Sequence, residues 1–318
     1  MNQARFHKQN EAFWAAFSQG LHLLDKRKAE QPAKFPEEYR RICQHLALAR
    51  HRGYTSDLVD RLNDLAVRGH HHLYRRPASL FGRMGLFIAR DFPRAVRAEW
   101  RLILLSAVLF YGPFFGMIGA IQIEPDLVYS VLDPGMVAQM EAMYDPSSPA
   151  FQDRQADSDL YMFGFYIKNN IGIAFRTFAG GVFAGIGSSF ILLYNGLFIG
   201  AAAGHLTEIG YTSTFWQFVV THGAFELTAI ILAGAAGLRL GLAFISPGRH
   251  SRSQALREAA RKATPILYGF TLFLVIAAFI EAFWSSTHWL GPVRYFVGIP
   301  MWVVVHAYLG LAGRTWGR

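Results

Sequence analysis

The apolar positions of the chain follow two patterns, amphipathic in the first third and nearly continuous afterwards. Within residues 1–75, apolar side chains recur mostly at steps of three and four, which is the spacing of a buried helical face. Phe6 and Trp14 lie on the first of these stripes, a proline pair opens the second helix, and Gly53 ends it. Residues 1–78 are therefore predicted to form a cytosolic bundle of three antiparallel helices.

Residues 79–101 combine a continuous apolar face with a group of arginines. A helix with this pattern lies in the headgroup plane of a membrane and attracts anionic lipids. The alternative is a fourth bundle helix, but the position directly before an apolar run favours an interfacial amphipathic helix. We expect contact with the lipid bilayer through Arg90, Arg94, Arg97 and Arg101.

From residue 102 onward, apolar runs are long enough to cross a bilayer core of about 30 Å. A loop at 124–159 separates the first run from a longer one, which is split near Gly185 into two helices. The predicted fold is thus all-α, a polytopic integral membrane protein. Its transmembrane domain, residues 102–318, has six spans at about 102–123, 160–183, 188–206, 215–245, 264–284 and 295–313.

Charge assigns these segments to the two sides of a membrane. The 318 residues carry a net charge of +9, with 17% charged and 52% hydrophobic side chains. Residues 1–101 hold 19 of the 31 Lys and Arg, whereas residues 124–160 hold eight acids and one base. Because Lys and Arg remain cytoplasmic, both termini and the basic segment 247–262 are expected inside and the 124–159 loop outside. The basic residues flank apolar runs, which argues against a nucleic-acid partner.

The beginning of the chain and its cysteine content add two expectations. Residues 1–11 are polar and no apolar stretch follows them, so insertion would depend on the internal spans. Cys43 is the single cysteine, which excludes an intramolecular disulfide. We expect a multi-pass protein of the bacterial cytoplasmic (inner) membrane.

Polar residues within the spans are costly and therefore default to functional or interhelical roles. His222 and Glu226 are four residues apart and share a helix face. They form an incomplete metal motif, since a zinc-binding helix needs a second histidine. A structural or gating role is therefore favoured. A proton relay is the more specific alternative. We predict one intramembrane polar network of Asn169, Asn170, Arg176, Asn195, His222 and Glu226.

Glycines follow one another through the second and third spans. Small residues at four-residue spacing let helix backbones approach closely, so a packing seam, within the chain or between subunits, is the default. A glycine-lined pore is the alternative. The expected packing glycines are Gly180, Gly181, Gly196, Gly200 and Gly204.

No catalytic constellation is apparent in the sequence: there is no phosphate-binding loop, nucleophile elbow or complete zinc motif. His70, His71 and His72 are consecutive, so on a helix they point about 100° apart and a solvated basic segment is favoured over a metal site. The chain is predicted to be no enzyme and to hold no cofactor or metal.

Two elements carry a resemblance to a known family: the Asn169-Asn170 pair within an aromatic run, and His222-Gly223-x-x-Glu226. With Asn195-Gly196-x-x-x-Gly200, they make the chain similar to the stage II sporulation protein M family. The resemblance implies an integral membrane protein without known enzymatic activity. Longer members of this kind resemble those of bacteria that never sporulate, and accompany MoxR-type AAA ATPases and von Willebrand A domain membrane proteins.

Two functions remain open at this point. The first is a homo-oligomeric inner-membrane scaffold or assembly protein that organises partner proteins at the membrane or cell envelope. The second is a membrane channel or transporter that uses the polar groups of spans two to four as its pathway. An intramembrane hydrolase would need a nucleophile or a bound metal.

Overall fold

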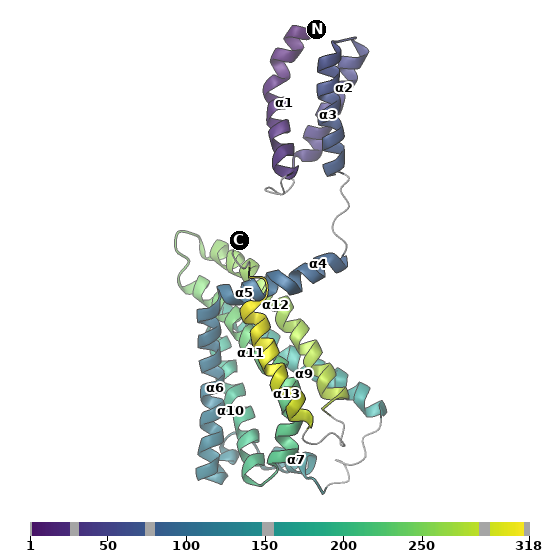
Figure 1. Ribbon diagram of the computed structural model, residues 1–318. Coiled ribbons are helices and arrows are strands. Elements are labelled where there is room, and N and C mark those ends of the chain that lie inside the picture. Colours follow the sequence, from purple (N-terminus) through teal and green to yellow (C-terminus); the bar gives the residue numbers. More distant parts are fainter. Residues whose placement is uncertain (1, 26–31, 74–79, 148–155, 286–292, 315–318) are drawn as a thin grey trace. The chain divides into compact units, whose positions relative to one another are not determined.

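The computed structural model describes residues 2–25, 32–73, 80–147, 156–285 and 293–314. Within 156–285, the side chains are described from residue 163 onward. The described residues are helical or lie in short connections, without a strand (Figure 1). The chain forms two compact units, Met1–Arg83 and Met84–Arg318.

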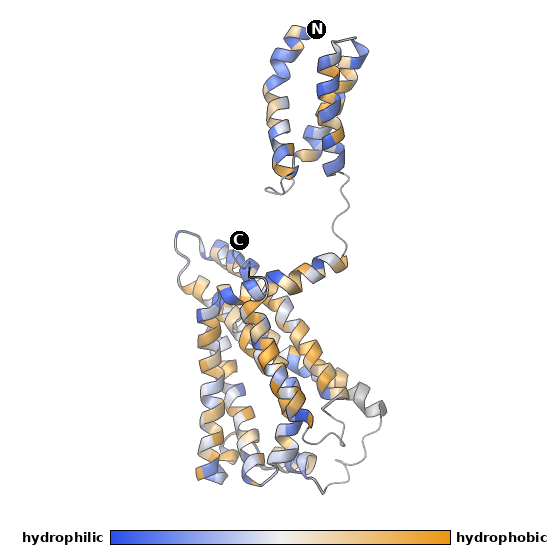
Figure 2. Cartoon of the chain, in the orientation of Figure 1, coloured by the Kyte–Doolittle hydropathy of each residue, from blue (hydrophilic) through white to orange (hydrophobic). Residues whose placement is uncertain are grey.

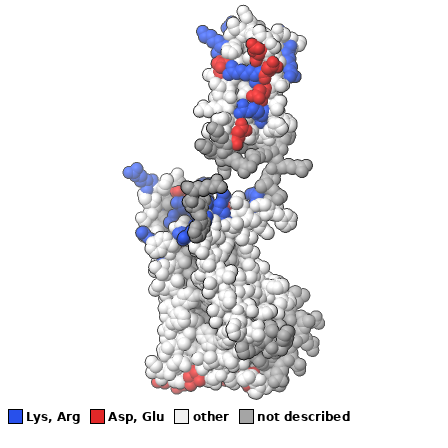
Figure 3. Space-filling view, viewed as in Figure 1, with Lys and Arg blue, Asp and Glu red and all other residues white. Residues whose placement is uncertain are grey.

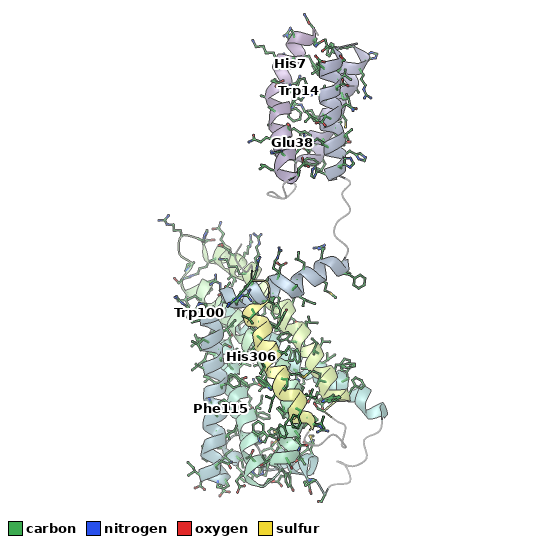
Figure 4. The ribbon with its side chains drawn as sticks, viewed as in Figure 1. His7, Trp14, Glu38, Trp100, Phe115 and His306 are labelled. Atoms are coloured by element: carbon green, nitrogen blue, oxygen red, sulfur yellow. The ribbon has the colours of Figure 1, made fainter. Side chains whose placement is uncertain are left out.

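The N-terminal unit consists of α1 (Gln3–Asp25), α2 (Phe35–His51) and α3 (Ser56–Leu73). The stripes expected from the sequence are the buried faces of these helices, and they share one hydrophobic core. Trp14 at its centre is fully buried (Figure 4), and its indole N–H donates to Nδ1 of His45 at 2.9 Å. Outside the core, Arg61 forms a two-pronged ion pair with Glu11 at 3.0 and 2.9 Å.

The segment predicted as one interfacial helix is divided into α4 (Leu80–Leu86), a π-helical turn η1 (Phe87–Asp91) and α5 (Phe92–Ala98). Pro93, which lacks a backbone N–H, lies in the first turn of α5, where no donor is needed. The last two residues of the predicted helix instead begin the first long apolar helix, α6 (Trp100–Ile123). Trp100 is therefore on a different element from the arginines of α5 (Figure 4).

After α6, the membrane unit continues with α9 (Ala156–Ala179), α10 (Ile186–Glu208), α11 (Thr212–Ile245), α12 (Arg252–Phe283) and α13 (Val293–Leu311). Apolar residues dominate these helices along most of their length (Figure 2). Among the described residues, five helices are long and apolar enough to cross a membrane: α6, α10, α11, α12 and α13. The predicted span at 160–183 corresponds to α9, whose first seven side chains lie outside the described residues.

Helix α11 is the centre of the membrane unit. It buries 72% of its most apolar stretch, against 22% for α6 and for α13. Its buried face consists mainly of alanine, glycine and leucine between Ala229 and Gly241. Small side chains on the central helix allow the other helices to surround it closely.

One glycine seam joins α10 to α6. A Cβ built on Gly196 would lie 2.3 Å from the carbonyl oxygen of Phe110, and one on Gly200 would lie 2.6 Å from that of Phe114. Gly204 meets the Cα of Ile118 at 3.1 Å. The partners follow in the same order along both helices, so α6 and α10 run parallel.

A second seam joins the connection between α9 and α10 to α11. Here a 3₁₀ turn, η3 (Gly180–Val182), and a left-handed Gly185 (φ +81°) reverse the chain near the predicted split. A Cβ on Gly181 would lie 2.0 Å from the carbonyl oxygen of Gly237, and one on Gly180 would lie 2.8 Å from the backbone of Gly187. All five predicted packing glycines are thus at close backbone contacts within one chain.

The acidic loop after α6 is folded where it is described. It forms η2 (Pro125–Ser130) and α7 (Pro134–Tyr144), and the Asp133 side chain caps α7 by accepting from the Met136 N–H at 3.0 Å. Val128, Leu132 and Val137 pack against the last turns of α6 and against α10. The loop therefore covers one end of the membrane unit.

Charges separate between the two ends of the membrane unit. In Figure 3, Lys and Arg gather at the end where α5 lies, and Asp and Glu at the end where α7 lies, with a white band between them. Arg94 and Arg97 of α5 donate to the carbonyl oxygens of Gly313 and Leu309, both at 2.8 Å, at the end of α13. These arginines therefore also satisfy free carbonyls of a helix C-terminus.

We expect Gly196→Ala to destabilise the membrane unit, because its methyl group collides with the Phe110 carbonyl and overpacking costs about 1–3 kcal/mol. The measurement is the melting temperature of the purified protein in detergent. Gly310→Ala is the matched control, since a Cβ there meets nothing within 4 Å. Equal melting temperatures for both variants would refute the seam.

Acid should weaken the N-terminal unit through His45. Burial, and then the charge of Arg41, lowers the pKa of His45 from its ordinary 6.5, so the folded unit binds a proton less readily than the unfolded chain. The neutral ring stabilises the fold fully above pH 6.5, and this contribution is lost as the pH falls below it. A proton on Nδ1 would also break the Trp14 bond, at a cost of about 1 kcal/mol.

Amide exchange of α1–α3 peptides in the full chain measures this loss between pH 7.5 and pH 5. We expect a smaller pH effect in His45→Gln, because glutamine does not titrate and its amide oxygen can accept from Trp14. Identical pH effects in both proteins would assign the change to other groups.

Candidate functional site

The polar residues of α9 and α10 bond mainly within their own helices. Asn169 donates to Asn170 at 3.1 Å, and Asn195 donates to the Ile191 carbonyl at 2.7 Å. Arg176 is exposed and donates to the Gly172 carbonyl at 3.1 Å, four residues earlier. Among the described residues, the six polar groups therefore do not form the single predicted network.

A different cluster forms where α11 meets α12. His222 and Glu226 come from α11 at the predicted i,i+4 spacing, and Glu281 comes from the end of α12. One ligating atom from each side chain lies within 4.8 Å of the other two. His222 and Glu281 are 5% and 7% exposed, so the cluster lies inside the protein.

The neighbours of the cluster orient its imidazole. Nδ1 of His222 lies 3.2 Å from the hydroxyl of Ser285, which is 1% exposed. The ring of Phe218 packs edge-on against the same imidazole at 5.1 Å. The tautomer of His222 decides whether Nδ1 or the Ser285 hydroxyl donates; in the tautomer with the proton on Nδ1, Nε2 keeps a lone pair that can bind a further group.

Glu226 is held differently from His222. Its Oε2 atom is inaccessible to solvent and accepts no hydrogen bond from any described residue. A buried carboxylate oxygen without a donor is costly. This atom therefore identifies the cluster as a place where a further group can bind.

A cavity of about 520 Å³ lies beside His222 and Glu226. Its wall comes from α6, α10, α11 and α13 and is largely aromatic, including Phe114, Phe198 and Trp302. Phe115, which also lines it, is 63% exposed on the outer surface of α6 (Figure 4). The arrangement is an apolar chamber with one imidazole and one carboxylate on its wall.

A second pair of histidine and glutamate lies at the acidic end of the unit. Nε2 of His205, on α10, is 2.7 Å from Oε1 of Glu141, on α7. The Glu141 side chain is 39% exposed and the His205 side chain 8%. This pair ties the folded loop to α10, and Thr214 ties it to α11 by donating to the Tyr144 carbonyl at 2.8 Å.

The remaining predicted lipid contacts have partners on the protein. Arg90 pairs with Asp91 at 2.8 Å, and the Arg101 guanidinium lies 5.4 Å from the Trp100 ring centroid. In α5, burial lowers the pKa of Arg97, followed by the charges of Arg314 and Arg94. The contact of these four arginines with headgroups stays a prediction.

Comparison with known families covers both units of the chain. Residues 103–286 match the model of stage II sporulation protein M. This chain belongs to the stage II sporulation protein M family. The match contains both carboxylates of the cluster, the histidine and every packing glycine, and it confirms the resemblance drawn from the sequence.

The N-terminal unit of this stage II sporulation protein M family member has a separate match. Residues 4–75 correspond to a domain of unknown function (DUF8413). No curated protein and no solved structure is significantly similar to the chain.

Sequence reasoning missed the role of Glu281 in the cluster. The residue was visible as an acid at the end of the fifth span, but 55 residues separate it from Glu226. Its only signal was that an acid in an apolar helix needs a partner. Helical spacing identifies neighbours within one helix and gives no register between two helices.

Proposed function

We propose that this protein is a non-enzymatic scaffold of the bacterial inner membrane, with six spans and both termini in the cytoplasm. Its N-terminal unit would be held at the cytoplasmic surface, and its acidic loop would face outward. The observation that carries this topology is the parallel seam between α6 and α10, because it constrains how often the chain crosses the bilayer.

Two neighbouring spans can be parallel only if the chain recrosses the membrane between them. Gly196, Gly200 and Gly204 meet α6 in parallel order, and α9 is the long helix between α6 and α10. A crossing by α9 brings the chain back to the side where α6 began. This adds a sixth span to the five apolar helices.

The separated charges support the orientation. The end with α5 and the start of α12 carries the basic residues, and the end with α7 carries acidic ones (Figure 3). Lys and Arg near spans remain on the cytoplasmic side. The N-terminal unit precedes α6, the first span, along the chain, so the same rule assigns it to the cytoplasm.

Partners are proposed from two kinds of support. Family resemblance favours a MoxR-type AAA ATPase and von Willebrand A domain membrane proteins. A homo-oligomer is supported by Gly112, Gly116 and Gly119 of α6, where a Cβ would meet nothing within 4 Å in the single chain. Another small-residue helix face could pack closely on this strip.

The cavity favours a second candidate function, in transport. A pathway through spans two to four no longer has Arg176 on it, since that side chain is exposed. The chamber beside His222 and Glu226 nevertheless offers space for a largely apolar molecule with one polar group. It would serve a channel or carrier better than a purely structural protein.

Topology can be tested with single cysteines in a Cys43→Ser background. Ser147 precedes α9 and Phe183 follows it, and both are exposed. We expect an impermeant maleimide to label Ser147→Cys from outside intact cells and Phe183→Cys only from the cytoplasmic side. Labelling of both from the same side would rule out a crossing by α9.

The two functions differ in their response to a filled cavity. Ala202 lines the chamber, whereas Leu104 is 57% exposed on α6 away from it and serves as the control. For a scaffold, Ala202→Phe and Leu104→Phe should both keep co-purification with the MoxR-type ATPase and complement a deletion strain equally well. If only Ala202→Phe fails to complement while association persists, transport is the better function.

A further inference from the structure

We propose that His222, Glu226 and Glu281 bind one divalent transition-metal ion, of the Zn²⁺ or Mn²⁺ class, between α11 and α12. The site would be formed by one imidazole and two carboxylates. It is independent of the scaffold function, because it rests on the packing of these two helices alone.

The positions of the ligands suit a single ion. Imidazole nitrogens and carboxylate oxygens bind Zn²⁺ at about 2.0–2.2 Å, so two ligands of one tetrahedral ion lie roughly 3.5 Å apart. The three atoms here lie within 4.8 Å of one another. Side-chain rotation by about an ångström would close the set around an ion.

Charge gives the reason for an ion at this place. Two carboxylates held together in an apolar interior repel each other, and desolvation adds to the cost. Oε2 of Glu226 has no hydrogen-bond donor among the described residues. A divalent cation would supply the missing partner of this Glu226 oxygen.

The residues around the cluster would orient its metal ligands and let an ion enter and leave. Ser285 holds the imidazole of His222 through Nδ1, as outer partners of metal-ligating histidines do. His222 and Glu226 both face the 520 Å³ cavity, which provides a way in and room for a further ligand. Imidazole with carboxylates favours Zn²⁺, Mn²⁺ or Fe²⁺ over Ca²⁺, which prefers oxygen ligands alone.

The protein contains its own control for this site. His205 and Glu141 also form a histidine–glutamate pair, at 2.7 Å, but no third ligand among the described residues completes it. Glu141→Gln therefore removes a carboxylate beside a histidine without touching the proposed site. It is the matched counterpart of Glu226→Gln and Glu281→Gln.

The test uses the untagged full chain in detergent, stripped with a chelator and dialysed against Zn²⁺ or Mn²⁺. Metal per chain is measured by elemental analysis, and the melting temperature is followed with and without metal. Subtracting the content of a Glu226→Gln/Glu281→Gln double variant removes ions bound by the consecutive histidines His70, His71 and His72.

We expect the protein and Glu141→Gln to hold one equivalent more than the double variant, and to melt at a higher temperature with metal. Each single variant at Glu226 or Glu281 should lose this metal-dependent rise, and Ca²⁺ should not produce it. The proposal is wrong if the unsubstituted protein holds no more metal than the double variant. It is also wrong if neither metal nor chelator changes the melting temperature of the unsubstituted protein. Should the double variant fail to fold, the metal content of a His70→Ala/His71→Ala/His72→Ala variant decides instead: one equivalent retained supports the site, and none overturns it.

Discussion

The close approach of helix backbones at glycine is the contact on which the membrane unit depends. In a bilayer, lipid tails are as apolar as the side chains, so helices associate through packing rather than through the hydrophobic effect. Gly196 and Gly200 bring α10 onto carbonyl oxygens of α6, and Gly181 brings the α9–α10 turn onto Gly237 of α11. A single methyl group at these positions would separate the backbones.

These seams determine where the polar groups end up. Because α11 is surrounded on several sides, the face that bears His222 and Glu226 turns partly toward α12 and partly toward the cavity. Glu281 enters the same space from α12. The cluster is therefore a product of the register between α11 and α12.

The two units follow different physical rules. In the N-terminal unit, water drives Trp14 and its apolar neighbours into a core, and charged side chains remain outside. In the membrane unit, large side chains such as Phe115 face outward and small ones such as Gly237 lie inside. One chain thus combines a water-formed core with a lipid-solvated surface.

Much of this protein could be predicted from the sequence. Periodicity found the stripe that contains Phe6 and Trp14, charge separated the two ends of the spans, and the Asn-Asn and His-Gly-x-x-Glu elements identified the family. These are local properties, because propensity, hydropathy and spacing are read along one segment.

Contacts between segments required the tertiary structure. Rotation of α9 about its axis left Arg176 exposed, while Ala174 and Thr177 on the same turn are buried. The pairing of α11 with α12 joined Glu281 to the histidine and glutamate of α11. Such contacts depend on the rotation of each helix about its axis and on its shift along its neighbour. The sequence of an apolar helix does not determine either one, because lipid solvates each face of the helix about equally well.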